Sequence, residues 1–179
     1  MPCGGTSSGA GGVPETISDT GPILHLHEIG RLAALSIVHP LRAPDLVWSE
    51  LEARGIGHPA LQKAGVDLTI ASLEDSDWKN ALAGAGPQKI QPADAQVFAL
   101  ARSGRFQALV LTDDLALRQL IESHGATVAG SVGVLIRAYS SGKLDRRQLD
   151  DAFRALFDES TLHLSQAFRA YLAQLLKGL

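Results

Sequence analysis

The chain has 179 residues, of which 45% are hydrophobic and 20% charged, and its formal net charge is −3. This length suits one domain with a sizeable core, and the charge excludes a domain that binds nucleic acid through a large overall positive charge. The single cysteine, Cys3, excludes an intrachain disulfide and a cysteine-based zinc site. No apolar stretch approaches the roughly 18–20 residues of a membrane span, and no secretory signal is recognisable. We therefore expect a cytoplasmic protein.

Short strands and helices alternate along the first half of the chain. Residues 1–14 are rich in Gly and Ser and predict a disordered N-terminal tail. The predicted elements that follow are a strand at about 16–18, a helix from Pro22, a helix at about 45–54, a short helix at about 60–64 and a strand at about 67–71. Residues 74–91 are polar and contain the breakers Gly84, Gly86 and Pro87, so they predict an irregular segment.

The same alternation continues in the second half. The predicted elements are a helix at about 92–102, a buried strand at 107–111, a helix at about 114–124, a strand at 127–129, and helices at about 132–140, 146–157 and 162–176. This order predicts an α/β domain with a parallel sheet between helical layers. The last helix carries a wide apolar stripe of Leu164, Phe168, Tyr171, Leu172, Leu175 and Leu176. Such a stripe either packs on the domain core or forms a dimer or partner surface.

Four acidic positions stand where apolar runs meet helices. Asp19 directly follows the first predicted strand, and the pair Asp113–Asp114 directly follows the buried strand at 107–111. Parallel strands end at one shared edge of a sheet, so these acids lie close together if their strands are neighbours. Asp94 is in the first turn of its helix and Glu50 is near the middle of another, and each can point toward that edge.

The chemistry of such a cluster points to a divalent cation. Two carboxylates about 5 Å apart repel by roughly 3 kcal/mol at an effective dielectric of about 20. Several of them stay ionised together only beside a cation, and hard cations such as Mg²⁺ or Mn²⁺ prefer oxygen ligands. One or two such ions can activate water for attack on phosphorus. Each acid also has a structural interpretation, as a helix cap or a solvated surface charge.

The order of these motifs resembles that of the PIN-domain family. The motifs are Asp19-Thr20-Gly21-Pro22, Val47-Trp48-Ser49-Glu50-Leu51, the helix that begins Asp94-Ala95-Gln96-Val97, and Leu111-Thr112-Asp113-Asp114, with residues 128–135 like the closing segment of many members. The resemblance covers about residues 16–143. It implies a three-layer α/β/α sandwich, dependence on Mg²⁺ or Mn²⁺, and cleavage of RNA phosphodiester bonds. Many prokaryotic members are toxins of VapBC-type toxin–antitoxin pairs, usually dimeric and inhibited by an antitoxin.

Carried over to this chain, the resemblance implies that Asp19, Glu50 and Asp94 are the first three acids of the site. Asp114 fits the commoner spacing for the fourth, and Asp113 remains the alternative. Asp19 and Asp114 would ligate the metal, Asp94 would share it, and Glu50 would hold a water or a second ion. The predicted organisation is a tail at 1–14, a nuclease domain at 15–143, and a helical extension at 144–179 that packs on the domain or mediates association.

The resulting hypothesis is a metal-dependent endoribonuclease, possibly the toxin of a type II toxin–antitoxin pair, with RNA as substrate, an antitoxin partner and a homodimeric assembly. A non-catalytic PIN-like module that binds RNA or protein is the alternative. The six histidines include no HExxH pattern and favour structural or surface roles. Arg102, Arg105 and Arg118 either contact the RNA backbone or are solvated charges.

Overall fold

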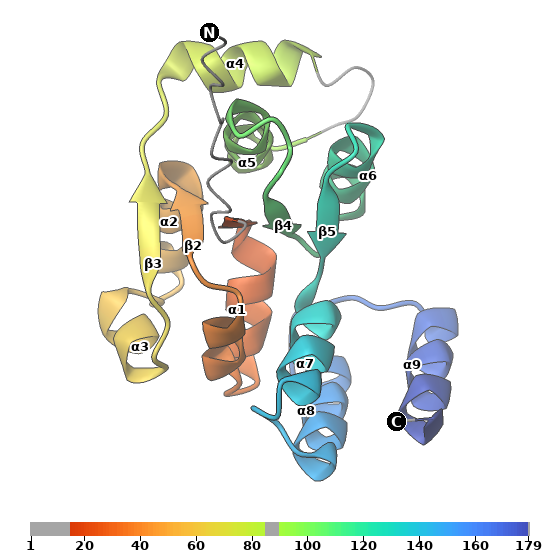
Figure 1. The fold of residues 1–179 in the computed structure, drawn as a ribbon. Coiled ribbons are helices and arrows are strands. Elements are labelled where there is room, and N and C mark those ends of the chain that lie inside the picture. The colour runs from red at the N-terminus through yellow and green to blue at the C-terminus, as the bar shows by residue number, and fades with distance from the viewer. Residues whose placement is uncertain (1–14, 85–89, 179) are drawn as a thin grey trace, which may run out of the picture.

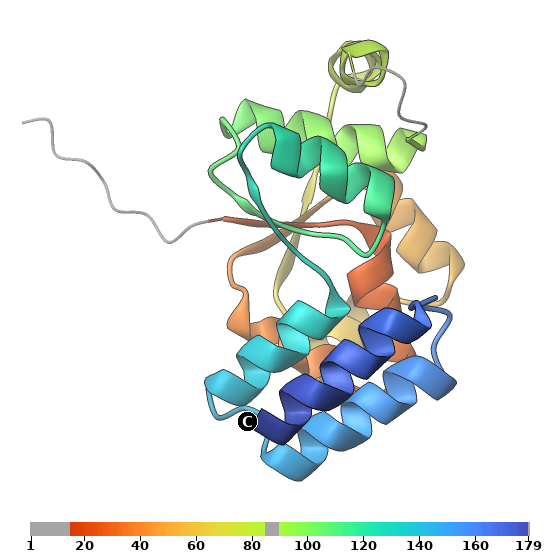
Figure 2. The same ribbon diagram turned by 90° about the vertical axis from the view of Figure 1, so that its right-hand side faces the viewer.

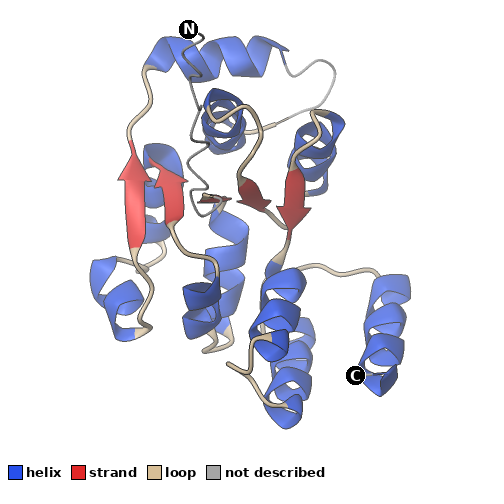
Figure 3. Ribbon diagram, in the orientation of Figure 1, coloured by secondary structure: helices blue, strands red, loops and turns tan. Residues whose placement is uncertain are grey.

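The computed structural model describes residues 15–84 and 90–178, so the expected tail at 1–14 and the breakers Gly86 and Pro87 lie outside the described residues. Its centre is a five-stranded sheet in the order β3-β2-β1-β4-β5 (Figure 3). All neighbouring strands pair in parallel. The strands are β1 (Thr16–Ser18), β2 (Leu41–Pro44), β3 (Leu68–Ala71), β4 (Leu109–Leu111) and β5 (Thr127–Ala129).

The two central strands are buried on both faces. Ile17 in β1 and both Val110 and Leu111 in β4 are fully inaccessible to solvent. Continuous burial of this kind is expected where helices cover both faces of a parallel sheet. Because β1 and β4 are direct neighbours, the residues that follow them lie at the same edge of the sheet. This pairing places Asp19 beside the Asp113–Asp114 pair.

Helices cover both faces of the sheet (Figures 1 and 2). One layer contains α5 (Pro92–Ser103) and α6 (Leu115–Ser123), with α4 (Asp75–Gly84) packed against α5. The opposite layer contains α1 (Thr20–Glu28), α7 (Ser131–Ser140) and α8 (Arg146–Asp158). The predicted α/β/α sandwich with a parallel sheet is thereby confirmed.

Shorter helices connect these layers. A 3₁₀ segment, η1 (Leu32–Ile37), packs against α1 and α7, and α3 (His58–Lys63) leads into β3. Helix α2 (Asp45–Ala53) contacts both α1 and α5. Because α2 reaches helices of both layers, it brings Glu50 to the edge where β1 and β4 end.

Two elements differ from the sequence-based expectation. Strand β2 was not predicted, because it is only four residues long, carries Arg42 and ends in Pro44. Its parallel pairing with both β1 and β3 shows that tertiary context decides such a short segment. The expectation of an irregular segment at 74–91 was wrong for α4, which begins with Asp75 and Asp77 in its first turn. Acidic residues in the first turn stabilise a helix through its dipole. Gly84 nevertheless favours a break in the sequence pattern, because glycine is a poor helix former.

The two C-terminal helices pack very differently. Leu149, Phe153 and Leu156 of α8 are almost wholly buried, and α8 packs on α7. In α9 (Gln166–Gly178) only Leu172 is buried, while Phe168 and Tyr171 are 38% and 59% exposed. The apolar stripe therefore packs only in part on the domain. Among the helices of residues 15–84 and 90–178, none is long and apolar enough to cross a membrane.

Candidate active site

Asp19 lies between the end of β1 and the start of α1, where it caps the helix. Its Oδ1 accepts a hydrogen bond from Thr20 N at 2.6 Å, and its Oδ2 accepts one from Thr112 Oγ1 at 2.9 Å. Burial and, next to it, the negative charge of Asp94 raise the pKa of this carboxyl from 3.8 to about 7, although both hydrogen bonds oppose the shift. The fold thus holds an acid at the sheet edge whose charged form is costly without a cation.

Asp94 lies in the first turn of α5, and its charge acts on Asp19. Its Oδ2 accepts a hydrogen bond from Gln91 N at 2.7 Å, as part of a capping box at the start of the helix. Burial raises the pKa of Asp94, the Gln91 N–H lowers it, and the charges of Asp114 and Glu50 raise it again. These mutual effects show that the acids interact electrostatically across the sheet edge.

Glu50 reaches the same edge from α2. Its carboxylate is exposed, and Oε2 accepts a hydrogen bond from Thr20 Oγ1 at 2.5 Å. Thr20 thus contacts Asp19 through its backbone and Glu50 through its hydroxyl. The hydroxyls of Thr20 and Thr112 were not among the predicted site residues. Their positions, directly after Asp19 and directly before Asp113, are the sequence signal that could have identified them.

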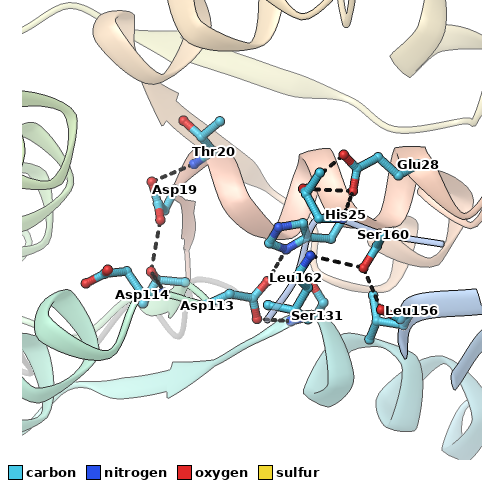
Figure 4. A network of polar contacts seen from close by, with 12 residues as sticks. Asp19, Thr20, His25, Glu28, Asp113, Asp114, Ser131, Leu156, Ser160 and Leu162 are labelled. Carbon is cyan, nitrogen blue, oxygen red and sulfur yellow. Dashed lines mark hydrogen bonds and ion pairs between the residues drawn. The ribbon is translucent and has the colours of Figure 1, made fainter. Parts of the chain in front are cut away.

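The structure separates the neighbouring acids Asp113 and Asp114 (Figure 4). Asp114 caps α6, with Oδ1 accepting from Leu117 N at 2.8 Å, and its charge acts on Asp94. Asp113 turns instead toward His25 and Ser131. It accepts from Ser131 N at 2.8 Å and Ser131 Oγ at 2.5 Å, and it pairs with His25 Nδ1 at 2.8 Å. We refer to Asp113, His25 and Ser131 as the Asp113 network.

The remaining four acids, Asp19, Glu50, Asp94 and Asp114, form what we call the acid cluster. Within the described part of the chain, no Lys, Arg or His forms an ion pair with any of them. In the same residues, no three His, Cys, Asp or Glu side chains are close enough to form a ready metal site. The donors themselves suit a hard divalent cation, because they are carboxylate oxygens with no other positive partner in that region. A bound ion would have to draw these side chains closer together.

Comparison with known families identifies the family of the chain. A sequence profile of the family DUF3368, described as a PIN domain, matches residues 15–177. The chain belongs to the PIN-domain family. No curated protein and no solved structure matches the chain significantly. PIN domains are generally nucleases, and the match covers the sheet and all members of the acid cluster. It also continues through α8 and into α9, while the predicted division into a domain at 15–143 and an extension at 144–179 stays a prediction.

Two further residues shape the PIN domain near its acids. Arg118 donates to the carbonyl oxygen of Thr112 at 3.1 Å, so this guanidinium supports the backbone just before Asp113. Gly130 precedes α7, and a Cβ there would lie 2.4 Å from Asp113 Oδ1. Only glycine allows Asp113 to approach the start of α7 so closely. Contacts of Arg102, Arg105 and Arg118 with an RNA backbone stay predictions.

Proposed function

We propose that this PIN domain is a metal-dependent endoribonuclease that hydrolyses RNA phosphodiester bonds. The acid cluster carries the proposal, because its carboxylates act on one another electrostatically at one sheet edge, and none of them has a cationic partner among the described residues. Folding brings like charges together here at a cost in stability, and a functional site explains why that cost persists. The family relationship supports a nuclease, and the restriction to RNA is part of our proposal.

In this proposal Asp19 and Asp114 hold Mg²⁺ or Mn²⁺, Asp94 shares it, and Glu50 holds a water or a second ion. The ion supplies Lewis acidity toward water and phosphate oxygens. Thr112 and Thr20 fix the orientation of the Asp19 carboxylate through the two hydrogen bonds to its oxygens. The proposal leaves Asp113 out of this set, because Asp113 pairs with His25 in its own network, whereas none of the four acids has such a partner among the described residues.

The decisive experiment is cleavage of a labelled single-stranded RNA with Mn²⁺ or Mg²⁺ by the wild-type chain and by Asp19→Asn. We expect cleavage by the wild type and loss of at least about 100-fold in the variant, since removal of one group that stabilises transition-state charge costs this much. Asp67→Asn is the matched control, because Asp67 is an exposed acid just before β3, at the other end of the strands. Equal rates for wild type and Asp19→Asn would refute the mechanism.

A toxin role belongs to the same proposal at a finer level. It would involve an antitoxin protein as inhibitor and a homodimeric, cytoplasmic enzyme. The cheapest discriminator is genomic: a small reading frame directly upstream that encodes a DNA-binding antitoxin favours the toxin over a housekeeping ribonuclease. Arrest of growth on induction of the wild type, but not of Asp19→Asn, would favour the same role.

A non-catalytic PIN-like module is the second candidate, and one observation favours it. Three of the acids have a structural role. Asp19, Asp94 and Asp114 each accept a hydrogen bond from a backbone N–H group at the start of a helix. Isothermal titration calorimetry separates the candidates. No heat of Mn²⁺ binding near millimolar concentration would favour the module that only binds RNA or protein.

A further inference from the structure

A cavity of about 680 Å³ lies between α9 and the β5 side of the domain. Its walls come from β5, from α7 and from α9, and include Val128, Ile136, Phe168 and Leu175. Figures 1 and 2 both place α9 beside α7 and α8 on this side of the molecule. The volume is in the range of pockets that hold small organic groups such as a nucleoside. Helix α9 thus covers the domain without filling the space beneath it.

Two aromatic side chains stand exposed in this cavity. Phe168 and Tyr171 of α9 line it, and their rings stack with centroids 6.1 Å apart. Neither ring is needed to close the core, since α9 buries only Leu172. Exposed aromatic rings in a cavity are a platform on which a flat ring can stack.

The cavity extends to the edge that carries the acid cluster. Asp113, which follows β4 at the same sheet edge, lines the cavity, whereas none of the four acids of the cluster is among its described lining residues. Arg118 and Arg137 also line it, and the guanidinium of Arg118 additionally donates to Thr112 O and pairs with Glu122. Phosphate groups pair with arginine, and bases stack on aromatic rings. The cavity therefore offers the two kinds of contact that a nucleotide needs, and Asp113 places one end of it at the same sheet edge as the proposed site of cleavage.

We propose that this cavity is a subsite for single-stranded RNA, in which a base stacks on Phe168 and Tyr171 while Arg118 or Arg137 contacts the adjacent phosphate. This inference builds on the proposed function, because it extends the RNA path from the acid cluster to α9. An apolar protein segment is the competing occupant, since much of the lining is aliphatic. The arginines and the adjacent acid cluster favour RNA, because an apolar segment would use neither.

The test measures binding rather than cleavage, so that it does not depend on catalysis. Fluorescence anisotropy of a 5′-fluorescein-labelled 12-nucleotide single-stranded RNA is followed in excess EDTA. Phe168→Ala and Tyr171→Ala should each weaken binding by about 5- to 50-fold, in line with the loss of one base–aromatic stack. Tyr171→Trp should restore wild-type affinity, because it keeps a stacking surface.

Trp78→Ala is the matched control, since Trp78 is a half-buried aromatic residue of α4, outside the cavity. Its RNA affinity should equal that of the wild type. A second approach fills the cavity: Ile136→Trp on α7 leaves both aromatic residues in place and should weaken binding as much as Tyr171→Ala.

Three results would overturn the subsite. They are equal affinities for wild type and the two alanine variants, a Tyr171→Trp variant as weak as Tyr171→Ala, and no measurable binding by the wild type. The first would leave a protein segment as the occupant. RNA binding that depends on the aromatic residues, without any metal-dependent cleavage, would refute the proposed nuclease but support the subsite. Metal-dependent cleavage with an unchanged KM in Tyr171→Ala would support the nuclease but refute the subsite.

Discussion

Two sets of carboxylates lie side by side at one edge of this sheet, and they differ in their partners. Asp113 is surrounded by donors, with Ser131 N, Ser131 Oγ and His25 Nδ1 all within 2.8 Å of its oxygens. The acid cluster has hydrogen bonds but no positive partner in the described residues, and burial and mutual repulsion raise the pKa of both Asp19 and Asp94. A satisfied carboxylate stabilises a fold, whereas an unsatisfied group of them indicates a function that supplies the missing charge.

The largest difference between the two sets should appear in activity. Asp94→Asn removes a charge from the acid cluster but preserves the side-chain oxygen that caps α5, so RNA cleavage should fall on the order of 10²- to 10³-fold while the fold is kept. Initial rates at saturating Mn²⁺, together with the melting temperature, measure both. Wild-type activity in Asp94→Asn would remove Asp94 from the site.

The converse change should affect stability. Asp113→Ala leaves Ser131 and His25 without their shared acceptor, and Ser131 is fully buried, so we expect a loss of about 3 kcal/mol in the free energy of unfolding. Urea denaturation measures it, with exposed Asp67→Ala as control. Calorimetry on the folded fraction should show Mn²⁺ affinity close to wild type. Lost Mn²⁺ binding with unchanged stability would instead make Asp113 the fourth ligand.

A third difference should appear in the pH dependence of the metal-free protein. The pKa of Asp19 is about 7 in the folded state, against 3.8 for an ordinary aspartate such as that of the unfolded chain. Between these two pH values the folded protein therefore binds a proton that the unfolded chain has released. The stabilisation from this proton is complete below about pH 3.8 and is lost as the pH rises through 7. The stability of Asp19→Asn relative to wild type should therefore increase by on the order of 2–3 kcal/mol from pH 5 to pH 8.

Denaturation of both proteins in EDTA across that pH range measures the gap. An advantage of the Asn variant that is constant with pH would show that Asp19 does not titrate in this window. Asp113→Asn serves as the comparison for Asp19→Asn. Hydrogen-bond donors surround Asp113, so its replacement should lower the free energy of unfolding at every pH in this range.

The smallest effect concerns the approach of Asp113 to α7. A methyl group at position 130 would lie 2.4 Å from Asp113 Oδ1, so Gly130→Ala must displace that carboxylate. We expect a loss of about 1–2 kcal/mol, typical of forced local shifts in a packed region. Gly57→Ala is the control, since a Cβ there would come within 4 Å of a single described residue, Pro59, at the ordinary contact distance of 3.6 Å. Equal stabilities of the two variants would mean that the Asp113 network tolerates displacement.

The sequence predicts the site best where a candidate site residue directly follows a strand. Asp19 and the Asp113–Asp114 pair mark the ends of apolar strands, so parallel pairing alone predicts their meeting. Glu50 and Asp94 were harder, since a helix residue can face several directions. The four-residue strand β2 is too short to show a recognisable pattern, and Gly84 indicates a break in the sequence although it is the last residue of α4.

The choice between Asp113 and Asp114 lies beyond local sequence for a physical reason. Adjacent residues at the end of a strand point to different sides, and either can serve a metal. The structure separates them through partners far away in the chain, because His25 and Ser131 lie 88 and 18 residues from Asp113. Similarly, the role of Thr112 depends on its hydrogen bond to Asp19, which lies 93 residues away in the chain.

The hydroxyl of Thr112 has a consequence for how the site is loaded. Its oxygen accepts from Asp114 N at 3.1 Å while its hydrogen goes to Asp19 Oδ2, so one side chain links the two acids proposed to bind metal. Asp19 Oδ1 meanwhile accepts from Thr20 N. A proton on Asp19 must therefore occupy one of the lone pairs left over, which are the ones a cation would use. Proton and metal are thus competing occupants of one position, and metal binding near neutral pH should release protons to the solvent.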